Sequence, residues 1–167
     1  QVFMSEAVTL LEDEAVSVKM PRQGYVAGHL IVVPKTDAMI LEELDEAVLT
    51  KLLTLGNRLC GVLFEALECD GTNLFVQNGV AAGQVDDSVI LHVIPRWEED
   101  GLDFSWSKQK LGEAQLGQLE EQLSFAANND AIPSDNGEAR TVDSDDAEEV
   151  VEGADNYYAK QFKRGLR

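Results

Sequence analysis

The fold is decided by one stretch of sequence, residues 78–96, which reads NGVAAGQVDDSVILHVIPR. Its first half is rich in turn-forming Gly and Asn, and its second half contains the apolar run 89–94, which predicts a buried strand. Pro95 should end this strand, because proline cannot donate a hydrogen bond to a sheet ladder. The stretch therefore predicts a glycine-rich turn that leads into a buried strand, with His92 inside the apolar run.

Further strands are expected on both sides of this stretch. Residues 8–11 and 15–20 are short β-prone runs around an acidic turn, which predicts an antiparallel hairpin. Residues 28–35, GHLIVVPK, form a continuous apolar run that predicts a strand buried on both faces. A last strand is expected at residues 73–77, after an Asp-Gly turn.

Between these strands, apolar residues recur every three or four positions from Val48 onward. This spacing predicts a helix of about five to six turns, capped by Asp45 and preceded by a short helix at residues 37–43. Gly56 and Gly61 interrupt it at a cost of about 1 kcal/mol each relative to Ala, which is tolerable where another element packs closely. The predicted apolar stripe comprises Val48, Leu52, Leu55, Leu59, Val62, Leu63 and Leu67.

The two apolar runs resemble the histidine triad (HIT) family of nucleotidyl hydrolases and transferases. That family's signature reads roughly G-Q-x-x-x-H-x-H-x-H-V-I-P-R, and Gly83, Gln84 and residues 92–96 fall on it. Its second hallmark, G-H-x-x-V-x-P-K, is matched by residues 28–35. The resemblance implies an α+β fold: a five-stranded, mainly antiparallel sheet with one long helix, here extended by a C-terminal helix and an acidic tail.

Three positions depart from the family's pattern. Ser88 and Ile90 stand where the family has its first and middle histidines, and the middle histidine is the family's nucleophile. Pro21 stands where the family has an aspartate that holds the ribose hydroxyls. Because Ile90 has no lone pair with which to attack phosphorus, the nucleotidyl-histidine route is closed. We therefore predict no catalytic residue, while residual turnover by another route stays open.

The polar groups that remain predict a weak nucleotide- or phosphate-binding cradle. Each also has a structural interpretation: the histidines as hydrogen-bonded core residues, and the glutamine as a cap of its turn. Asp86 and Asp87 at the mouth would repel a phosphate. By the resemblance, the two histidines should lie near each other. The predicted cradle consists of His29, Gly83, Gln84, Ser88 and His92.

These features together indicate a non-catalytic HIT-like protein that serves as a binding or scaffold subunit. The alternatives are a weak nucleotide hydrolase, transferase or nucleotide sensor that uses the cradle, and a chain that regulates an intact HIT subunit. Family members usually pair through the long helix and a sheet edge, which implies a homodimer or a HIT-like heterodimer. We expect no cofactor and no metal ion.

The chain is strongly acidic, with a net charge of −18. This charge argues against a nucleic-acid partner, because phosphate contacts need basic patches. It fits either adaptation to a high-salt cytoplasm or an ordinary solvated acidic surface. No secretory signal and no apolar run of about 20 residues is apparent, so we expect a cytoplasmic protein without a membrane partner. Cys60 and Cys69 should be reduced thiols.

The composition predicts three regions: a HIT-like domain at 1–127, an acidic flexible linker at 128–153 and a basic, aromatic docking helix at 154–167. The first region should end in an amphipathic helix at residues 111–125. In the last region, aromatic and apolar residues recur at i, i+4 and i+8 beside basic residues, a pattern typical of a helix that docks on its own domain or on a protein partner. The predicted docking residues are Tyr158, Phe162, Leu166, Lys163 and Arg164.

Overall fold

The structure, a computed structural model, describes residues 3–4 and 6–129, with side chains as far as residue 124. Contacts divide the chain into one unit whose described part ends at Leu102 and another that begins at Asp103. The predicted docking residues, and all but the first two residues of the predicted linker, lie outside the described residues. The boundaries of the three regions therefore stay predictions.

The first unit contains a five-stranded sheet in the order β1-β2-β3-β5-β4, with every neighbouring pair antiparallel. The predicted α+β fold is confirmed, as are the hairpin of β1 and β2 and the fully buried β3. The central strands, β3 and β5, pair with Ile31 opposite His92. The strands are β1 (Val8–Glu12), β2 (Val16–Met20), β3 (Leu30–Pro34), β4 (Gly71–Val76) and β5 (Leu91–Arg96).

The bounds of β5 differ from the prediction at both ends. The strand begins at Leu91 and continues through Pro95, which pairs with Thr72 of β4. The expectation that Pro95 ends the strand is therefore wrong. The last β5 residue paired with β3 is Val93, so at Pro95 the strand has a neighbour on one side only. Proline is tolerated there, because no ladder bond is needed on the open side.

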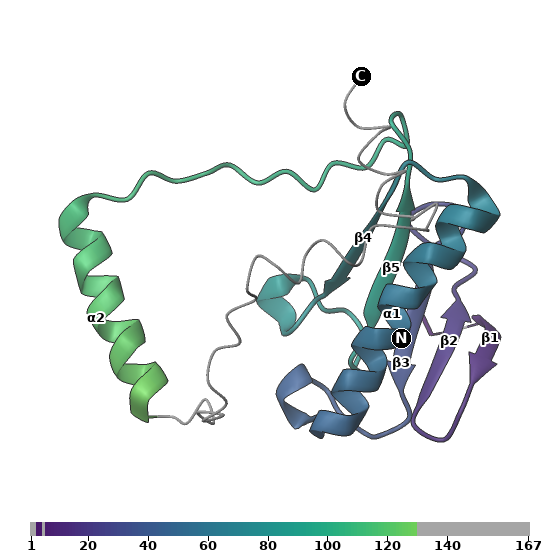
Figure 1. Cartoon of the computed structure of the whole chain (residues 1–167), viewed down its shortest axis with the longest axis horizontal. Coiled ribbons are helices and arrows are strands. Elements are labelled where there is room, and N and C mark those ends of the chain that lie inside the picture. The colour runs from purple at the N-terminus through teal and green to yellow at the C-terminus, as the bar shows by residue number, and fades with distance from the viewer. Residues whose placement is uncertain (1–2, 5, 130–167) are drawn as a thin grey trace, which may run out of the picture. The chain divides into compact units, whose positions relative to one another are not determined.

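The long helix α1 (Glu46–Leu67) covers one face of the sheet (Figure 1). It begins as predicted at the cap Asp45, whose side chain accepts a hydrogen bond of 2.9 Å from the backbone N–H of Val48. Leu52 and Leu63 are buried in the core between helix and sheet. By length and composition α1 would also suit a membrane span, so the expectation that no stretch is apolar enough needs correction. Its packing on the sheet accounts for the apolar residues that are buried, Leu52 and Leu63 among them.

The buried face of α1 is rotated from the predicted stripe. Val62 and Leu67 were expected to be buried but are 55% and 40% exposed, whereas Gly56 and Cys60 lie on the buried face. A Cβ at Gly56 would collide with a leucine side chain of β5, which explains the glycine. At Gly61 a Cβ would meet no described atom within 4 Å, so the close packing expected there is not found.

The described residues also form shorter helices. The predicted short helix at residues 37–43 is only a 3-10 turn, η1 (Leu41–Glu43), and a second such turn, η2 (Val80–Ala82), follows β4. Helix α2 (Glu113–Asn129) belongs to the second unit and confirms the helix predicted at residues 111–125. Its leucines, expected to form an apolar stripe, are all exposed: Leu116, Leu119 and Leu123.

The alternation of side chains along β3 divides the core into two parts. Val32 belongs to the core beneath α1, whereas Ile31 and Val33 belong to a second apolar cluster, which also contains Phe3 and Ile90. The second cluster lies on the sheet face away from α1, beside the two histidines. The candidate site is therefore built on this face.

Candidate functional site

The two histidines of the chain form a buried, hydrogen-bonded pair, which confirms that they lie together. His29 precedes β3 and His92 lies in β5, and their side chains are 1% and 2% exposed. The Nε2 atom of His29 lies 3.1 Å from the Nδ1 atom of His92. We name these two residues the histidine pair.

The hydrogen bonds of the histidine pair fix its proton positions. The backbone N–H of Tyr25 donates to Nδ1 of His29 at 3.2 Å, so this nitrogen carries no proton. His29 must then hold its proton on Nε2 and donate it to Nδ1 of His92. His92 in turn holds its proton on Nε2. Both imidazoles are therefore neutral. Their hydrogen bonds run in one direction, from the N–H of Tyr25 to His29 and from His29 to His92.

Burial keeps the histidine pair neutral. Loss of solvation, together with a smaller effect of the neighbouring His92, lowers the pKa of His29 to about 4. Burial likewise lowers the pKa of His92 to about 4. At neutral pH the pair therefore supplies a hydrogen-bond donor but no positive charge for a phosphate.

Aromatic rings enclose the histidine pair. The rings of Tyr25 and His29 stack at 5.0 Å between centroids, those of His29 and His92 at 5.2 Å, and those of His92 and Phe75 at 5.0 Å. The ring of Phe3 meets His92 edge-on at 5.0 Å and also contacts His29 and Tyr25. Edge-to-face and stacked contacts at these distances are favourable. The sequence reasoning did not anticipate that Tyr25, Phe75 and Phe3 belong to the site.

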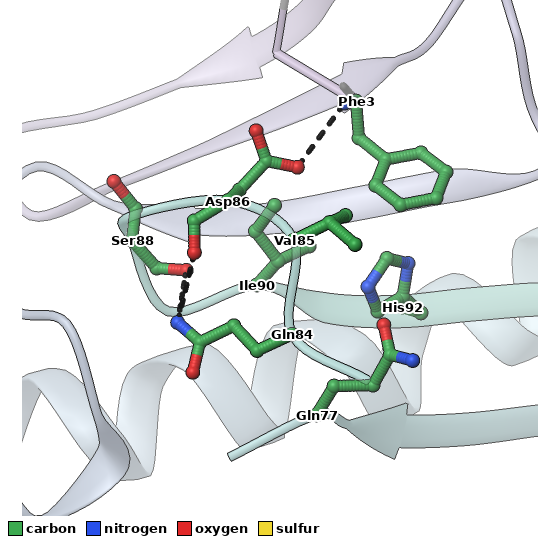
Figure 2. Close-up of a pocket in the computed structure, with 8 residues that line it drawn as sticks. All are labelled: Phe3, Gln77, Gln84, Val85, Asp86, Ser88, Ile90 and His92. Carbon is green, nitrogen blue, oxygen red and sulfur yellow. Dashed lines mark hydrogen bonds between the residues drawn. The ribbon is translucent and has the colours of Figure 1, made fainter. Parts of the chain in front are cut away.

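Asp86 holds the segment that carries Phe3. Its Oδ2 atom accepts a hydrogen bond of 3.2 Å from the backbone N–H of Phe3, and its side chain is only 5% exposed (Figure 2). The prediction had placed this carboxylate at the mouth of the site, facing a ligand. The structure instead pairs it with the chain itself, while Asp87 is exposed.

The glycine-rich loop before β5 is held together by Gln84. Its Oε1 atom accepts from the backbone N–H of Gly79 at 2.7 Å, and its Nε2 atom donates to the carbonyl oxygens of Met39 and Asp86 at 2.8 and 2.9 Å. The side chain of Gln84 is thus engaged by backbone groups, which supports the turn-capping interpretation over phosphate binding. Gly83 adopts a left-handed φ of +89°, which favours glycine.

Ile90 and Ser88 line the same small cavity as His92. Figure 2 shows Ile90 beneath Asp86 and the Phe3 ring beside His92. The cavity has a volume of about 10 Å³, enough for about one water molecule. Ile90 is 6% exposed and packs in the apolar cluster with Phe3. Ligand pockets usually measure about 300–1,000 Å³, so this site is closed to a nucleotide as it stands.

A larger hollow lies beside His29, along the loop between β2 and β3. It measures about 400 Å³, and Pro21 is part of its lining. Arg22 is the charged residue of its lining. In the part of the chain that the structure describes, no group of three or more His, Cys, Asp and Glu side chains is arranged to hold a metal ion.

Comparison with known proteins agrees with this architecture. Residues 3–99 match the family model of the HIT domain. The adenylylsulfatase HINT3 of Arabidopsis thaliana is 31% identical over 107 residues, which are 64% of this chain and 53% of that protein. The adenosine 5'-monophosphoramidase HNT1 of Saccharomyces cerevisiae is 32% identical over 102 residues, 60% of this chain and 62% of that protein. The chain thus spans little more than half the length of these relatives.

Other relatives cover the chain more fully. The uncharacterized HIT-like protein MJ0866 of Methanocaldococcus jannaschii is 32% identical over 117 residues, which are 70% of this chain and 86% of that protein. The crystal structure of a histidine triad nucleotide-binding protein from Candida albicans superposes with a TM-score of 0.67 at 26% identity, over 75% of this chain and 91% of that one. With the sheet, the helix and the histidine pair in place, these matches show that the chain belongs to the HIT family.

Proposed function

We propose that this chain is a non-catalytic HIT protein that acts as a binding or scaffold subunit. The observation that carries the proposal is Ile90, a buried apolar side chain at the position of the family's nucleophile. Isoleucine offers no lone pair, so it forms no covalent intermediate with a nucleotidyl group. The chain would thus lack the reaction that is named for its relatives.

His92 does not replace the missing nucleophile. In an extended strand, residues two apart are separated by about 6.6–6.8 Å, whereas reacting atoms must approach within about 3–3.5 Å. Nδ1 of His92 already accepts from His29, and its Nε2 carries the proton. Neither nitrogen therefore presents a free lone pair to a substrate while the histidine pair is intact.

The proposed subunit role also rests on exposed apolar surface. Strand β4 is one edge of the sheet, and an open edge is a surface on which another chain can pair. Leu74 of β4 is 39% exposed, and Leu53 and Val62 of α1 are 47% and 55% exposed. We propose that these elements pair with a second copy or with another HIT-like chain, as the family resemblance implies.

Turnover assays test the non-catalytic role. The chain would be incubated with adenosine 5'-monophosphoramidate, adenylyl sulfate and diadenosine tetraphosphate, the substrate types in the names of its relatives. We expect no product above a protein-free control, and no gain from Ile90→His alone. Turnover by the unaltered chain that disappears in His92→Ala would contradict the proposal.

A nucleotide sensor is the second candidate. It is favoured by the hollow of about 400 Å³ beside His29, with the guanidinium of Arg22 available to an anion. Calorimetry with adenosine monophosphate distinguishes the two roles. Binding at micromolar concentration that weakens in Arg22→Gln would favour the sensor, whereas absent binding favours the scaffold.

A further inference from the structure

Phe3 lies far from its contacts in the sequence but is one of the buried residues of the site. Its side chain is 7% exposed and packs with Ile31, Val33 and Ile90 on the sheet face opposite α1. Its ring also meets the rings of the histidine pair edge-on. The part of the face above the histidines is thus covered by a side chain from the beginning of the described chain.

The backbone of Phe3 is bound as well as its ring. Its N–H donates to Oδ2 of Asp86, a carboxylate that is 5% exposed and 83 positions away. A hydrogen bond to a charged acceptor is stronger than one between neutral groups. The site therefore recognises two parts of one residue, an aromatic ring and the peptide N–H beside it.

The space around Phe3 shows that the ring closes the site. Only about 10 Å³ remain between Phe3, Ile90, His92 and their neighbours, room for about one water molecule. At Glu6 the backbone adopts φ +59°, an uncommon conformation for a residue other than glycine, before β1 begins.

We propose that Phe3 is an intramolecular plug. The site binds an aromatic side chain together with its adjoining peptide N–H, and the chain itself supplies that ligand. The histidine pair becomes accessible when Phe3 leaves the site. Phe3 fills the space next to Ile90 and His92, so a second occupant must displace it. The plug governs access to the site and is independent of whether the site retains any chemistry.

Chemical modification of the two histidines reports directly on access to the site, because the chain contains no other histidines. Diethyl pyrocarbonate modifies exposed imidazoles, and ultraviolet absorbance follows their modification. We expect slow modification in the unaltered full chain. In Phe3→Ala it should be at least about tenfold faster, which corresponds to losing about 1.4 kcal/mol of protection.

A matched control and a rescue separate opening of the site from general loosening. Leu10→Ala removes a similar apolar side chain from β1, where Leu10 is 52% exposed, and should leave the modification rate unchanged. Apolar cavities of ring size bind small aromatic molecules, so toluene should raise the melting temperature of Phe3→Ala and slow its modification again. If Phe3→Ala does not fold, Phe3→Leu removes the ring but keeps much of the apolar volume; it should still be modified faster than the unaltered chain, and an equal rate would overturn the plug.

Each outcome decides a separate question. Equal modification rates in the unaltered chain, Phe3→Ala and Leu10→Ala would overturn the plug. Faster modification without any effect of toluene would overturn the ring-specific site. Turnover of adenosine 5'-monophosphoramidate by Phe3→Ala would support the plug while contradicting the non-catalytic role, so the two proposals fail in different experiments.

Discussion

Acidification should destabilise this protein in a pH range where its carboxylates barely titrate. The histidine pair has folded-state pKa values of about 4, below the 6.5 expected for each histidine in the unfolded chain. Between these values the unfolded state binds more protons than the folded state, so the free energy of unfolding falls as the pH falls. The contribution of the neutral histidine pair to the free energy of unfolding is complete above pH 6.5 and is lost progressively down to about pH 4.

The size of this effect follows from the pKa difference. At pH 5, each unfolded histidine lies about 1.5 pH units below its pKa, whereas each folded one remains mostly neutral. One unit corresponds to about 1.36 kcal/mol, so each histidine costs about 2 kcal/mol and the pair about 4 kcal/mol. This is a large part of the roughly 5–15 kcal/mol by which a domain is usually stable.

The carboxylates act mainly at lower pH. Hydrogen bonds from Lys51 and from the backbone lower the pKa of Asp13 to about 2, and those from Arg96 and from the backbone lower the pKa of Asp100. Their stabilising effect is present above the unfolded-state value of 3.8 and disappears only below it. The interval from pH 7 to pH 5 therefore reports chiefly on the histidines.

Urea unfolding followed by tryptophan fluorescence tests the prediction at pH 7, 6 and 5, with about 0.5 M salt to screen surface repulsion. The double variant His29→Asn with His92→Asn is the matched control, because its side chains do not titrate in this range. We expect a loss of about 4 kcal/mol in the unaltered chain and almost none in the control. Equal stability of the unaltered chain at pH 7 and pH 5 would refute the buried neutral pair.

Three other predictions concern the helix, the charge and the tail. Gly61→Ala should stabilise α1 by up to about 1 kcal/mol, whereas Gly56→Ala should destabilise it, because only Gly56 faces a side chain of β5; thermal unfolding of both variants checks this pair. If the acidity is a high-salt adaptation, the melting temperature should rise between about 0.1 and 1 M potassium chloride, and a flat or falling curve would favour an ordinary acidic surface. Tyr158→Ala with Phe162→Ala should weaken association in sedimentation experiments without changing core stability; strong destabilisation would mean that the tail belongs to the fold.

The elements of the fold were predictable because their signals are local. The cap at Asp45 and the helical spacing after it identified α1, and the apolar run before Lys35 identified β3. The buried face of α1 was predicted less accurately. Gly56 and Cys60 are not large apolar residues and add little to the helical periodicity, although both lie on the buried face. The prediction at Pro95 was wrong because a proline is tolerated in β5 only where the neighbouring β3 has stopped pairing, and the sequence does not show that point.

The site was only half predictable. The motifs brought His29 and His92 together, because each lies at a fixed position in a strand signature. They gave no indication of Phe3, whose contact with Asp86 spans 83 positions and follows no periodic pattern. The role of Gln84 was also undecidable from the motif, because a phosphate contact and a cap of its own turn require the same residue.

The proposed replacement of the nucleophile by Ile90 and the closure of the site by Phe3 are physically one arrangement. A histidine at residue 90 would pack against the apolar side chains of Phe3, Ile31 and Val33, and any ring nitrogen that is not bonded to Ser88 or His92 would be unsatisfied. An unsatisfied buried polar group costs about 1–3 kcal/mol, so an imidazole there would favour the loss of Phe3 from the cluster. Conversely, Phe3 needs the apolar surface of Ile90 to remain buried over the histidine pair. Each of the two residues thus makes the other favourable, and we expect that reversing either one alone leaves a poorly packed site.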